Sequence, residues 1–412
     1  MKCIINKQLV LSRAPDGPLV ASIGAFAKSL TEQGYALFSI RRHVLLAAGF
    51  SHWLKRNGVS LQHICSDHTL QYLHYRARQL RPRSEDAPAL KHLMDFLRGA
   101  ELIAAEKISA RTLTPVERCT QAYAQYLREA RALTEATIIN YRPVIDRFLN
   151  NNFNSGPVKL SRLTACDVVQ FVKNQAPQLH RESAKRLTIA LRSFLRYARY
   201  RGEVTLDLAA AVPVVANWSM SSIPRAIAED QARKLLASID RSTAMGLRDY
   251  AIVILLARLG LRSSEVVFLE LDDIDWSTGQ MIVRGKCGRR SALPVPTDVG
   301  EAIAAYLQHG RPTSTNRRVF LRNSAPIRGF RGPSAIACII ARAILRADIQ
   351  SPTKGAHQFR HALATQMLRH GASLAEIGDV LRHRSPQTTT IYAKVDLKAL
   401  RTLALPWPGG AR

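Results

Sequence analysis

Apolar residues recur every three to four positions through most of residues 20–205, and this spacing predicts helices that bury one face. The clearest case lies near the end of the region, where Leu187, Leu191 and Phe194 fall on one side of a helix and Arg186 and Arg196 on the other. The arginine side is interpreted as a solvated face or, because basic residues outnumber acidic ones from Arg181 to Arg201, as a contact to the DNA backbone.

Two stretches within this helical region resemble each other. The first contains residues 40–42, 50–54, 61–64, 71–73 and 96–98, and the second contains residues 138–141, 145–149, 160–163, 170–172 and 194–196. The offset between corresponding residues stays between 95 and 99. We interpret this as one helical module used twice. The alternative is that two unrelated amphipathic bundles share scattered Leu and Phe residues.

The pattern changes after residue 205. Residues 205–226 contain Pro213, Pro224 and a Ser-Met-Ser-Ser run and lack helical periodicity, which predicts an interdomain linker. Beyond it, alternating residues 279–284, a glycine-flanked turn at 285–288 and an extended segment ending at 294–296 predict a β-hairpin. The predicted helices are 229–239, 247–259, a short one from 264, 297–309, 334–347, 357–368, 373–381 and 386–392. The expected fold is mainly α, with an α+β C-terminal part.

The charge of the chain is strongly positive. There are 59 Lys and Arg residues against 31 Asp and Glu residues, a formal net charge of +28. Divided at Pro224, the two parts carry +15 and +13, so the surplus is not a basic tail. This charge favours a polyanionic partner whose phosphates each domain contacts. The alternative explanation is that the proteins of the source organism are basic in general. The length and a hydrophobic content of 47% fit two or three folded domains.

The sequence predicts neither a metal site nor a membrane segment. The six cysteines show no C-x-x-C spacing, so we expect no disulfide framework and no zinc site, as in a reducing cytoplasm. The longest apolar runs, 251–257 and 335–341, are too short to span a bilayer. The first residues lack a sustained apolar core and a cleavage site, so no signal peptide is expected.

A His-x-x-Arg pair at His357 and Arg360 places two side chains on one helix face, where they could grip a phosphate together. With 12 His and 45 Arg residues in the chain, chance alone yields about one such pair, so the surrounding motifs matter more. Those motifs occupy residues 243–249, 259–265, 352–361, 364–368, 371–374, 377–383 and 388–392.

Together these motifs resemble the tyrosine recombinases, also called the phage integrase family, over about residues 225–395. The family order of Arg262, Lys286, His357 with Arg360, His383 and Tyr392 is complete. The resemblance implies four parts: an arm-like N-terminal helical module (1–112), a core-binding SAM-like helical domain (113–205), a linker (206–225) and a catalytic domain with a C-terminal tail (226–412). Whether the first module binds DNA or protein stays open.

The resemblance also implies a role for each residue. Tyr392 is the expected nucleophile, which would form a 3′-phosphotyrosyl intermediate. Arg262 and Arg360 would hold the nonbridging phosphate oxygens, because a guanidinium is always charged and offers a planar fork of donors. Lys286, at the hairpin tip, would protonate the departing 5′ oxygen. Backbone N–H groups after Arg262 are also expected to face the phosphate.

The remaining polar residues of the motifs have supporting roles. His357 and His383 are expected to hydrogen-bond the phosphate or to move protons. His361 is predicted to be structural, and Glu265 to orient basic groups. Two positions depart from the family pattern: Arg382 stands where a glycine often precedes the second histidine, and Ala362 where a small hydroxyl residue is common.

The implied function is site-specific recombination of double-stranded DNA by four protomers, for integration, excision or transposition of a mobile element. The reaction would need no metal, nucleotide or other cofactor. Two alternatives use the same fold: a type IB-like topoisomerase and a noncatalytic DNA-binding regulator. An apolar stripe at Leu397, Leu400 and Leu403 would dock either on a neighbouring protomer or on its own domain.

Overall fold

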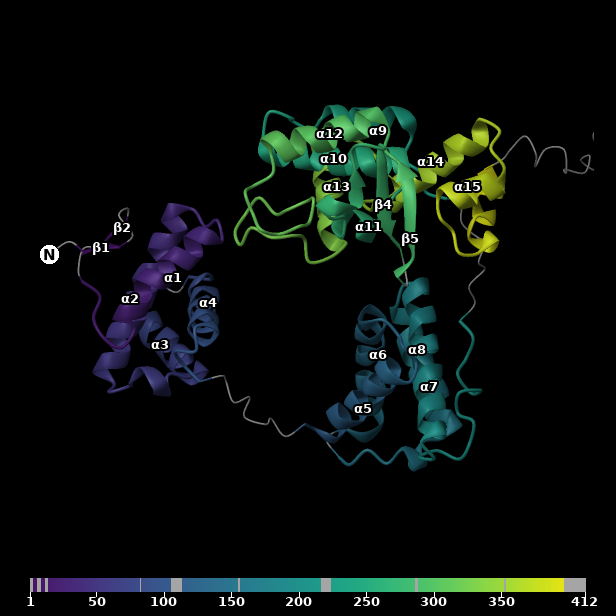
Figure 1. Ribbon diagram of the computed structural model, residues 1–412. Coiled ribbons are helices and arrows are strands. Elements are labelled where there is room, and N and C mark those ends of the chain that lie inside the picture. Colours follow the sequence, from purple (N-terminus) through teal and green to yellow (C-terminus); the bar gives the residue numbers. More distant parts are fainter. Residues whose placement is uncertain are drawn as a thin grey trace, which may run out of the picture. The chain divides into compact units, whose positions relative to one another are not determined.

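The computed structural model describes residues 3–5, 9–11, 14–81, 83–104, 113–154, 156–215, 224–285, 288–351 and 353–395 (Figure 1). Internal contacts divide the chain into two units, Glu106–Ser221 and Met1–Ala105 with Ser222–Arg412. Lys286 and the tail beyond Val395, with its predicted apolar stripe, lie outside the described residues.

The first helical module packs four helices around one apolar core. Its elements are α1 (Val20–Glu32), α2 (Leu37–Arg56), η1 (Leu61–His63), α3 (Ser66–Gln79) and α4 (Asp86–Gly99), preceded by the antiparallel pair β1 (Cys3–Ile5) and β2 (Leu9–Leu11). The core includes Phe26, Phe50 and Leu97, all nearly inaccessible to solvent. Burial of these aromatic and aliphatic side chains is what stabilises the module.

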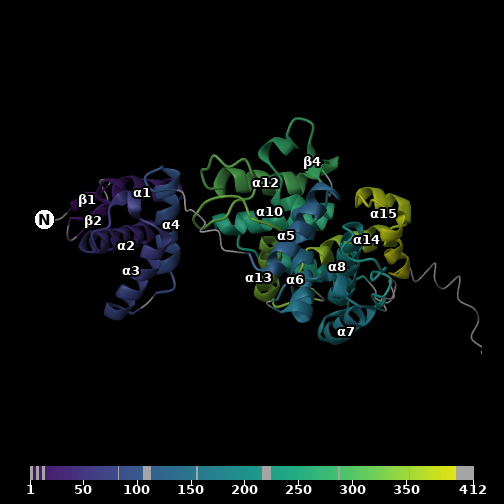
Figure 2. The same cartoon turned by 90° about the horizontal axis from the view of Figure 1, so that it is seen from below.

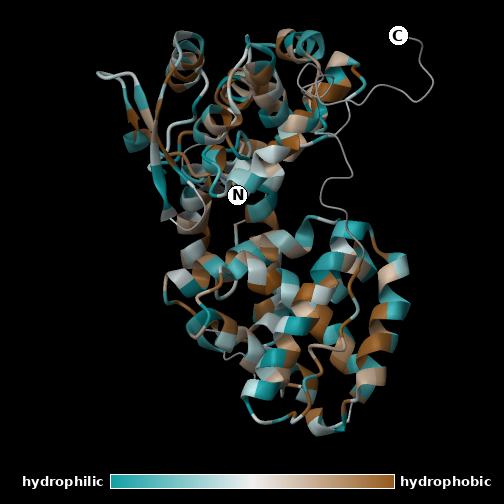
Figure 3. Ribbon diagram, turned by 90° about the vertical axis from the view of Figure 1, so that its right-hand side faces the viewer, coloured by the Kyte–Doolittle hydropathy of each residue, from teal (hydrophilic) through white to brown (hydrophobic). Residues whose placement is uncertain are grey.

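The second module is also a helical bundle with its own core. Its elements are α5 (Pro115–Glu129), α6 (Glu135–Phe153), η2 (Leu160–Arg162), α7 (Ala165–Gln175), η3 (Ala176–Gln178) and α8 (Arg181–Tyr200). Thr114 and Thr164 cap α5 and α7 through their hydroxyls. On α8 the predicted apolar face is buried, with Leu187, Leu191 and Phe194 all inaccessible. Figure 3 shows apolar and polar residues alternating along the helices, as amphipathic helices require.

The predicted repeat is confirmed in the order of elements. In the first module α2, η1, α3 and α4 begin at residues 37, 61, 66 and 86, and in the second α6, η2, α7 and α8 begin at 135, 160, 165 and 181. The second set therefore begins 95 to 99 residues after the first, and one more helix precedes each set. Figure 2 gives a second view of both bundles. The second module has one additional 3-10 helix, η3, between α7 and α8. The otherwise shared element order at nearly equal offsets favours a reused module over scattered similarity.

The C-terminal part combines helices with a small antiparallel sheet of order β3-β4-β5. Its elements are α9 (Glu229–Ala237), α10 (Ala244–Leu259), α11 (Ser263–Val267), η4 (Leu271–Asp273), β3 (Ile274–Asp275), β4 (Gln280–Arg284), β5 (Arg290–Pro294), α12 (Thr297–His309), α13 (Ser334–Ala347), α14 (His357–Arg369), α15 (Leu374–Val380), η6 (Pro386–Thr388) and η7 (Thr390–Val395). The predicted hairpin is β4 with β5, which pair from Gln280 with Pro294 to Arg284 with Arg290.

Helix α10 lies at the centre of this part. Residues 251–256 are all buried, which explains their unbroken apolar run. The helix ends at Gly260, whose φ of +55° is in the left-handed region that glycine adopts without strain. A Cβ there would lie 3.0 Å from side-chain atoms of both Leu363 and Leu381. Gly260 thus lets the chain turn closely against the helices that follow.

One predicted helix is wrong. Residues 386–392 form two short 3-10 helices, η6 and η7, in place of an α-helix. The threonine run explains this, because threonine hydroxyls compete for local hydrogen bonds and favour turns. Thr390 Oγ1 donates to Gln387 O at 2.9 Å, and Thr389 Oγ1 lies 2.7 Å from His383 Nδ1. The described linker residues, 206–215, 224 and 225, contain no regular helix, in line with the prediction.

Candidate active site

The motif residues that the structure describes come together from four elements. Arg262 is the N-cap of α11, and Arg360 lies on α14 with His357. His383 follows α15, and Tyr392 is on η7. Helices α14 and α15 lie side by side in both cartoon views (Figures 1 and 2). The site therefore depends on the packing of α10, α14 and α15 rather than on any single motif.

The turn end of the hairpin lies beside this site. Gly285 N–H donates to Arg289 O at 2.7 Å and closes the hairpin. A Cβ built on Gly285 would lie 4.0 Å from Glu265 Oε1. Gly285, the last described residue before Lys286, is thus next to the carboxylate that bonds Arg262.

Arg360 is a buried cation held by two helix ends. Its guanidinium donates to Gly260 O at 2.7 Å and also to Leu381 O. Gly260 and Leu381 are the C-caps of α10 and α15, where carbonyl groups carry partial negative charge. Burial, followed by repulsion from Arg262 and Arg382, lowers the Arg360 pKa from 12.5 to about 10. Arg360 stays charged at neutral pH, and its charge is only partly compensated.

A buried carboxylate links two further arginines. Glu265 is almost fully buried; its Oε1 accepts from Arg262 Nη1 at 2.7 Å, and its Oε2 accepts from Arg382 Nη2 at 3.0 Å. Glu265 thus contacts basic groups as predicted. Glu265 Oε2 also accepts from the backbone N–H of Arg262 at 2.8 Å. That N–H group therefore does not face the site, and α11 has only five residues, so the phosphate contact expected at this helix start finds no support.

Tyr392 lies among histidines. Its ring is 1% exposed, and its hydroxyl oxygen is 2.9 Å from His361 Nδ1. The ring of His383 stacks parallel to it, with centroids 6.5 Å apart. Burial raises the Tyr392 pKa to about 12, although Arg360 opposes this. A phenol in this setting is protonated at neutral pH, and it could act as a nucleophile only if a neighbouring group accepted its proton.

The three histidines are neutral at pH 7. Burial lowers the pKa of His357, and it brings those of His361 and His383 to about 4, with nearby positive groups adding to the effect. His357 stacks against His361 with centroids 5.9 Å apart. The sequence missed His361 as the partner of Tyr392; the available signal was its spacing of four from His357, which places both on one face of α14.

The described part of the chain offers neither a metal site nor a membrane span. No group of three or more His, Cys, Asp or Glu side chains there could hold a metal ion. No helix in the same residues is both long and apolar enough to cross a membrane.

Known families and proteins resemble the chain over much of its length. The model of the phage integrase family matches residues 225–398, and that of the phage integrase N-terminal SAM-like domain matches residues 120–202. The putative integrase/recombinase y4rA of Sinorhizobium fredii is 57% identical over 412 residues, which is all of both chains. The tyrosine recombinase XerD of Mycobacterium tuberculosis is 32% identical over 308 residues, 70% of this chain and 96% of XerD.

Solved structures share the fold at lower identity. XerH recombinase bound to its difH substrate has a TM-score of 0.55 and 20% identity, over 76% of this chain and 94% of XerH. A lambda integrase dimer bound to a core site has a TM-score of 0.53 and 16% identity, over 71% of this chain and 98% of the integrase. The chain belongs to the phage integrase, or tyrosine recombinase, family. Its activity is site-specific DNA recombination, which disfavours both the topoisomerase and the noncatalytic alternatives.

Proposed function

We propose that the protein cleaves and rejoins double-stranded DNA through a 3′-phosphotyrosyl intermediate on Tyr392. The observation that carries this proposal is the position of Tyr392, whose hydroxyl lies beside α14, the helix that carries the buried cation Arg360. Arg262 and Arg360 would hold the nonbridging oxygens of the scissile phosphate. The test is covalent capture of DNA by the wild-type protein and not by the Tyr392→Phe protein. The DNA is a site selected from a random duplex library by full-length Tyr392→Phe protein.

The proton of Tyr392 would pass to His361. In the attack, the bond from the tyrosine oxygen to phosphorus forms, the bond from phosphorus to the 5′ oxygen breaks, and the phenolic proton moves to His361 Nδ1. Lys286 is proposed to protonate the 5′ oxygen. His361 is proposed for this role because its Nδ1 lies 2.9 Å from the hydroxyl oxygen. Its lowered pKa means that the ring is unprotonated at neutral pH before DNA binds.

Substitution of His361 tests whether this histidine accepts the Tyr392 proton or only holds the Tyr392 hydroxyl in a resting position. In His361→Asn we expect adduct formation at pH 7 to slow by about 100-fold, and its rate to rise with pH between 7 and 9, because hydroxide must then remove the phenolic proton. Rates are measured with a nicked duplex that traps the adduct. The matched control is His370→Asn, an exposed histidine at the end of the same helix. Faster adduct formation in His361→Asn would mean that the bond holds Tyr392 in a resting state.

The DNA-bound state is proposed to be a tetramer on two duplexes. A lambda integrase tetramer bound to a Holliday junction has a similar fold, with a TM-score of 0.51. We also propose that the protein acts in the cytoplasm and serves integration, excision or transposition of a mobile element. The last point is supported by the similarity in fold to the Tn1549 transposon integrase, which has a TM-score of 0.50 and is solved with circular intermediate DNA.

The division of the chain into two helical modules and a C-terminal domain is proposed on the separation of its hydrophobic cores. One core draws only on residues 19–103 and a second on 116–212, while two more, on 227–359 and 364–392, both lie in the proposed catalytic domain. The second core includes Leu208, Ala209 and Val212, so the proposed linker is shortened to the residues after Val212. The first module lies outside both family matches, yet it repeats the element order of the second, which matches the SAM-like domain. We therefore propose that the first module also contacts DNA.

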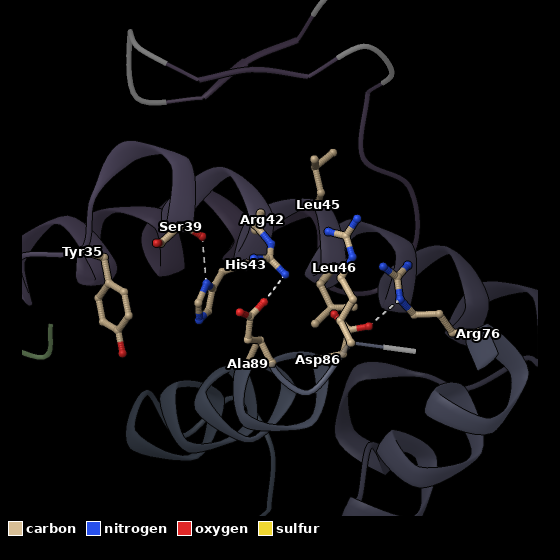
Figure 4. Close-up of a pocket in the computed structure, with 11 residues that line it drawn as sticks. Tyr35, Ser39, Arg42, His43, Leu45, Leu46, Arg76, Asp86 and Ala89 are labelled. Atoms are coloured by element: carbon tan, nitrogen blue, oxygen red, sulfur yellow. Dashed lines mark hydrogen bonds and ion pairs between the residues drawn. The ribbon is translucent and has the colours of Figure 1, made fainter. Parts of the chain in front are cut away.

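The end of α3 supplies the charge for such a contact. Four arginines lie within eight residues, at 76, 78, 81 and 83. Arg76 and Arg83 line a cavity of about 290 Å³ together with Arg42, and Figure 4 shows Arg42 on α2 and Arg76 on α3 around it. Arg76 is paired with Asp86, whereas Arg78, Arg81 and Arg83 are exposed. Exposed guanidinium groups beside a concave surface suit phosphate oxygens.

Removal of the exposed arginines tests this surface. We expect Arg78→Ala, Arg81→Ala and Arg83→Ala together to weaken binding to the selected DNA, and to reduce the slope of log K against log salt by about 2 to 3. The matched control replaces three other exposed cations of the module, Lys28, Arg56 and Lys91. An equal effect in both triple variants would contradict a specific surface, and no effect in either would favour a protein partner for this module.

A further inference from the structure

Arg382 occupies a position that disfavours its own side chain. Its φ is +55°, in the left-handed region that few residues other than glycine adopt. Its side chain is only 11% exposed, so burial lowers the pKa of its guanidinium. Its Nε is buried without a hydrogen-bond partner among the described residues. A glycine here would avoid all three costs, so the reason for arginine lies in what its side chain contacts.

The Arg382 side chain donates to the Val380 carbonyl at 3.1 Å, and its charged partner is the carboxylate that also bonds Arg262. Arg382 donates to Glu265 Oε2 at 3.0 Å, while Arg262 donates to Oε1 at 2.7 Å. Arg262 Nη2 also donates to the backbone carbonyl of Arg382 at 3.4 Å. Without the Arg382 side chain, the buried Glu265 would be compensated by the Arg262 side chain alone, and that pair would be neutral. Arg262 would then offer little net charge to a phosphate.

We propose that Arg382 is a positioning residue that takes up part of the negative charge of Glu265, so that Arg262 keeps its positive charge for the scissile phosphate. The inference rests on the proposed function. Arg262, Arg360, Arg382 and Glu265 together carry a formal charge of +2, and without Arg382 the sum is +1. The pentacoordinate phosphorus carries more negative charge than the bound phosphodiester, so the added cation stabilises the transition state more than the DNA complex.

The first variant is Arg382→Gly, because glycine accepts the left-handed backbone and removes only the side chain. At saturating selected DNA we expect adduct formation to slow by about tenfold or more, while the Kd for that DNA changes by less than about threefold. The matched control is Asp348→Gly at the end of α13, where φ is also left-handed at +48°. Asp348 makes none of the bonds to Glu265 or Arg262 that the described residues show, so this control should keep the wild-type rate.

The second variant distinguishes charge from packing. Glu265→Gln combined with Arg382→Gly restores the formal charge of +2, because it removes the carboxylate that Arg382 offset. We expect the double variant to form adduct at least about threefold faster than Arg382→Gly alone. Arg382→Lys keeps a cation near the carboxylate and should lie between the wild type and Arg382→Gly. A purely structural role for Arg382 predicts the opposite order, since the double variant loses two sets of buried contacts.

Adduct formation by the wild-type protein and by Arg382→Gly distinguishes a wrong role for Arg382 from a wrong function for the protein. If the wild-type protein forms no adduct with the selected DNA, the proposed function is contradicted, and this inference with it. If the wild type forms adduct and Arg382→Gly does so at the same rate, only the inference is overturned. A double variant no faster than Arg382→Gly also overturns it. Thermal melts of all five proteins, the wild type and the four variants, check that each is folded before rates are compared.

Discussion

A Tyr392→Phe protein should bind its DNA site as tightly as the wild type and form no covalent adduct with it. The substitution removes one oxygen from a ring that is 1% exposed, so the packing around residue 392 is retained. The lost hydrogen bond to His361 should cost about 1 kcal/mol of folding stability. Adduct formation should fall by at least about a thousandfold, since no other group can replace an essential nucleophile at that point.

Adduct is measured as a protein–DNA band that survives denaturing electrophoresis, and binding as a native gel shift. Tyr306→Phe is the matched control, because Tyr306 is also buried in the C-terminal part and its hydroxyl accepts from Leu321 N–H at 3.2 Å. This control should lose similar stability and keep full adduct formation. An adduct that persists in Tyr392→Phe would place the nucleophile at another residue.

Much of the fold and site could be predicted because the signals are local. The run of buried residues in α10, the hairpin of β4 and β5 and the repeated module all follow from periodicity and turn residues. The spacing of three between His357 and Arg360 predicts one shared helix face, and both residues lie on α14. Apart from the repeat, which is a comparison of two segments 95 to 99 residues apart, these features depend on residues close to each other in the sequence.

The rest depends on contacts between distant segments. His361 bonds Tyr392 across 31 residues, and Arg382 reaches Glu265 across 117. No periodicity encodes such pairs, which arise from the packing of α14 against α15 and η7. The failed helix at 386–392 has a similar cause, since Thr389 bonds His383 rather than continuing a helical pattern. Sequence reasoning therefore predicted residues that lie close together in the structure, but not the contacts that Arg382 and His361 make with Glu265 and Tyr392.

Adduct formation is also expected to depend strongly on the charge of Arg360. Its burial at 3% exposure and its bonds to the C-caps of α10 and α15 mean that a replacement must keep both a cation and two donors. Arg360→Ala would leave the Gly260 and Leu381 carbonyls without this partner and should slow adduct formation by about 1000-fold. Because it also removes buried bonds, the more informative change is Arg360→Lys.

Arg360→Lys should make the reaction depend on pH in a direction opposite to that of His361→Asn. The same burial and repulsion that lower the Arg360 pKa from 12.5 to about 10 would hold the pKa of a lysine well below its ordinary value of about 10.4. Below its pKa the lysine is charged, and adduct formation should be reduced about 10- to 100-fold. As pH rises toward 9 the lysine loses its proton, so activity should fall further, whereas the wild-type arginine stays charged.

Rates of adduct formation at pH 6.5, 7.5 and 9 on the selected DNA measure this dependence on pH. A deficit that is the same at all three values would mean that the geometry of the guanidinium, and not its charge, limits the reaction.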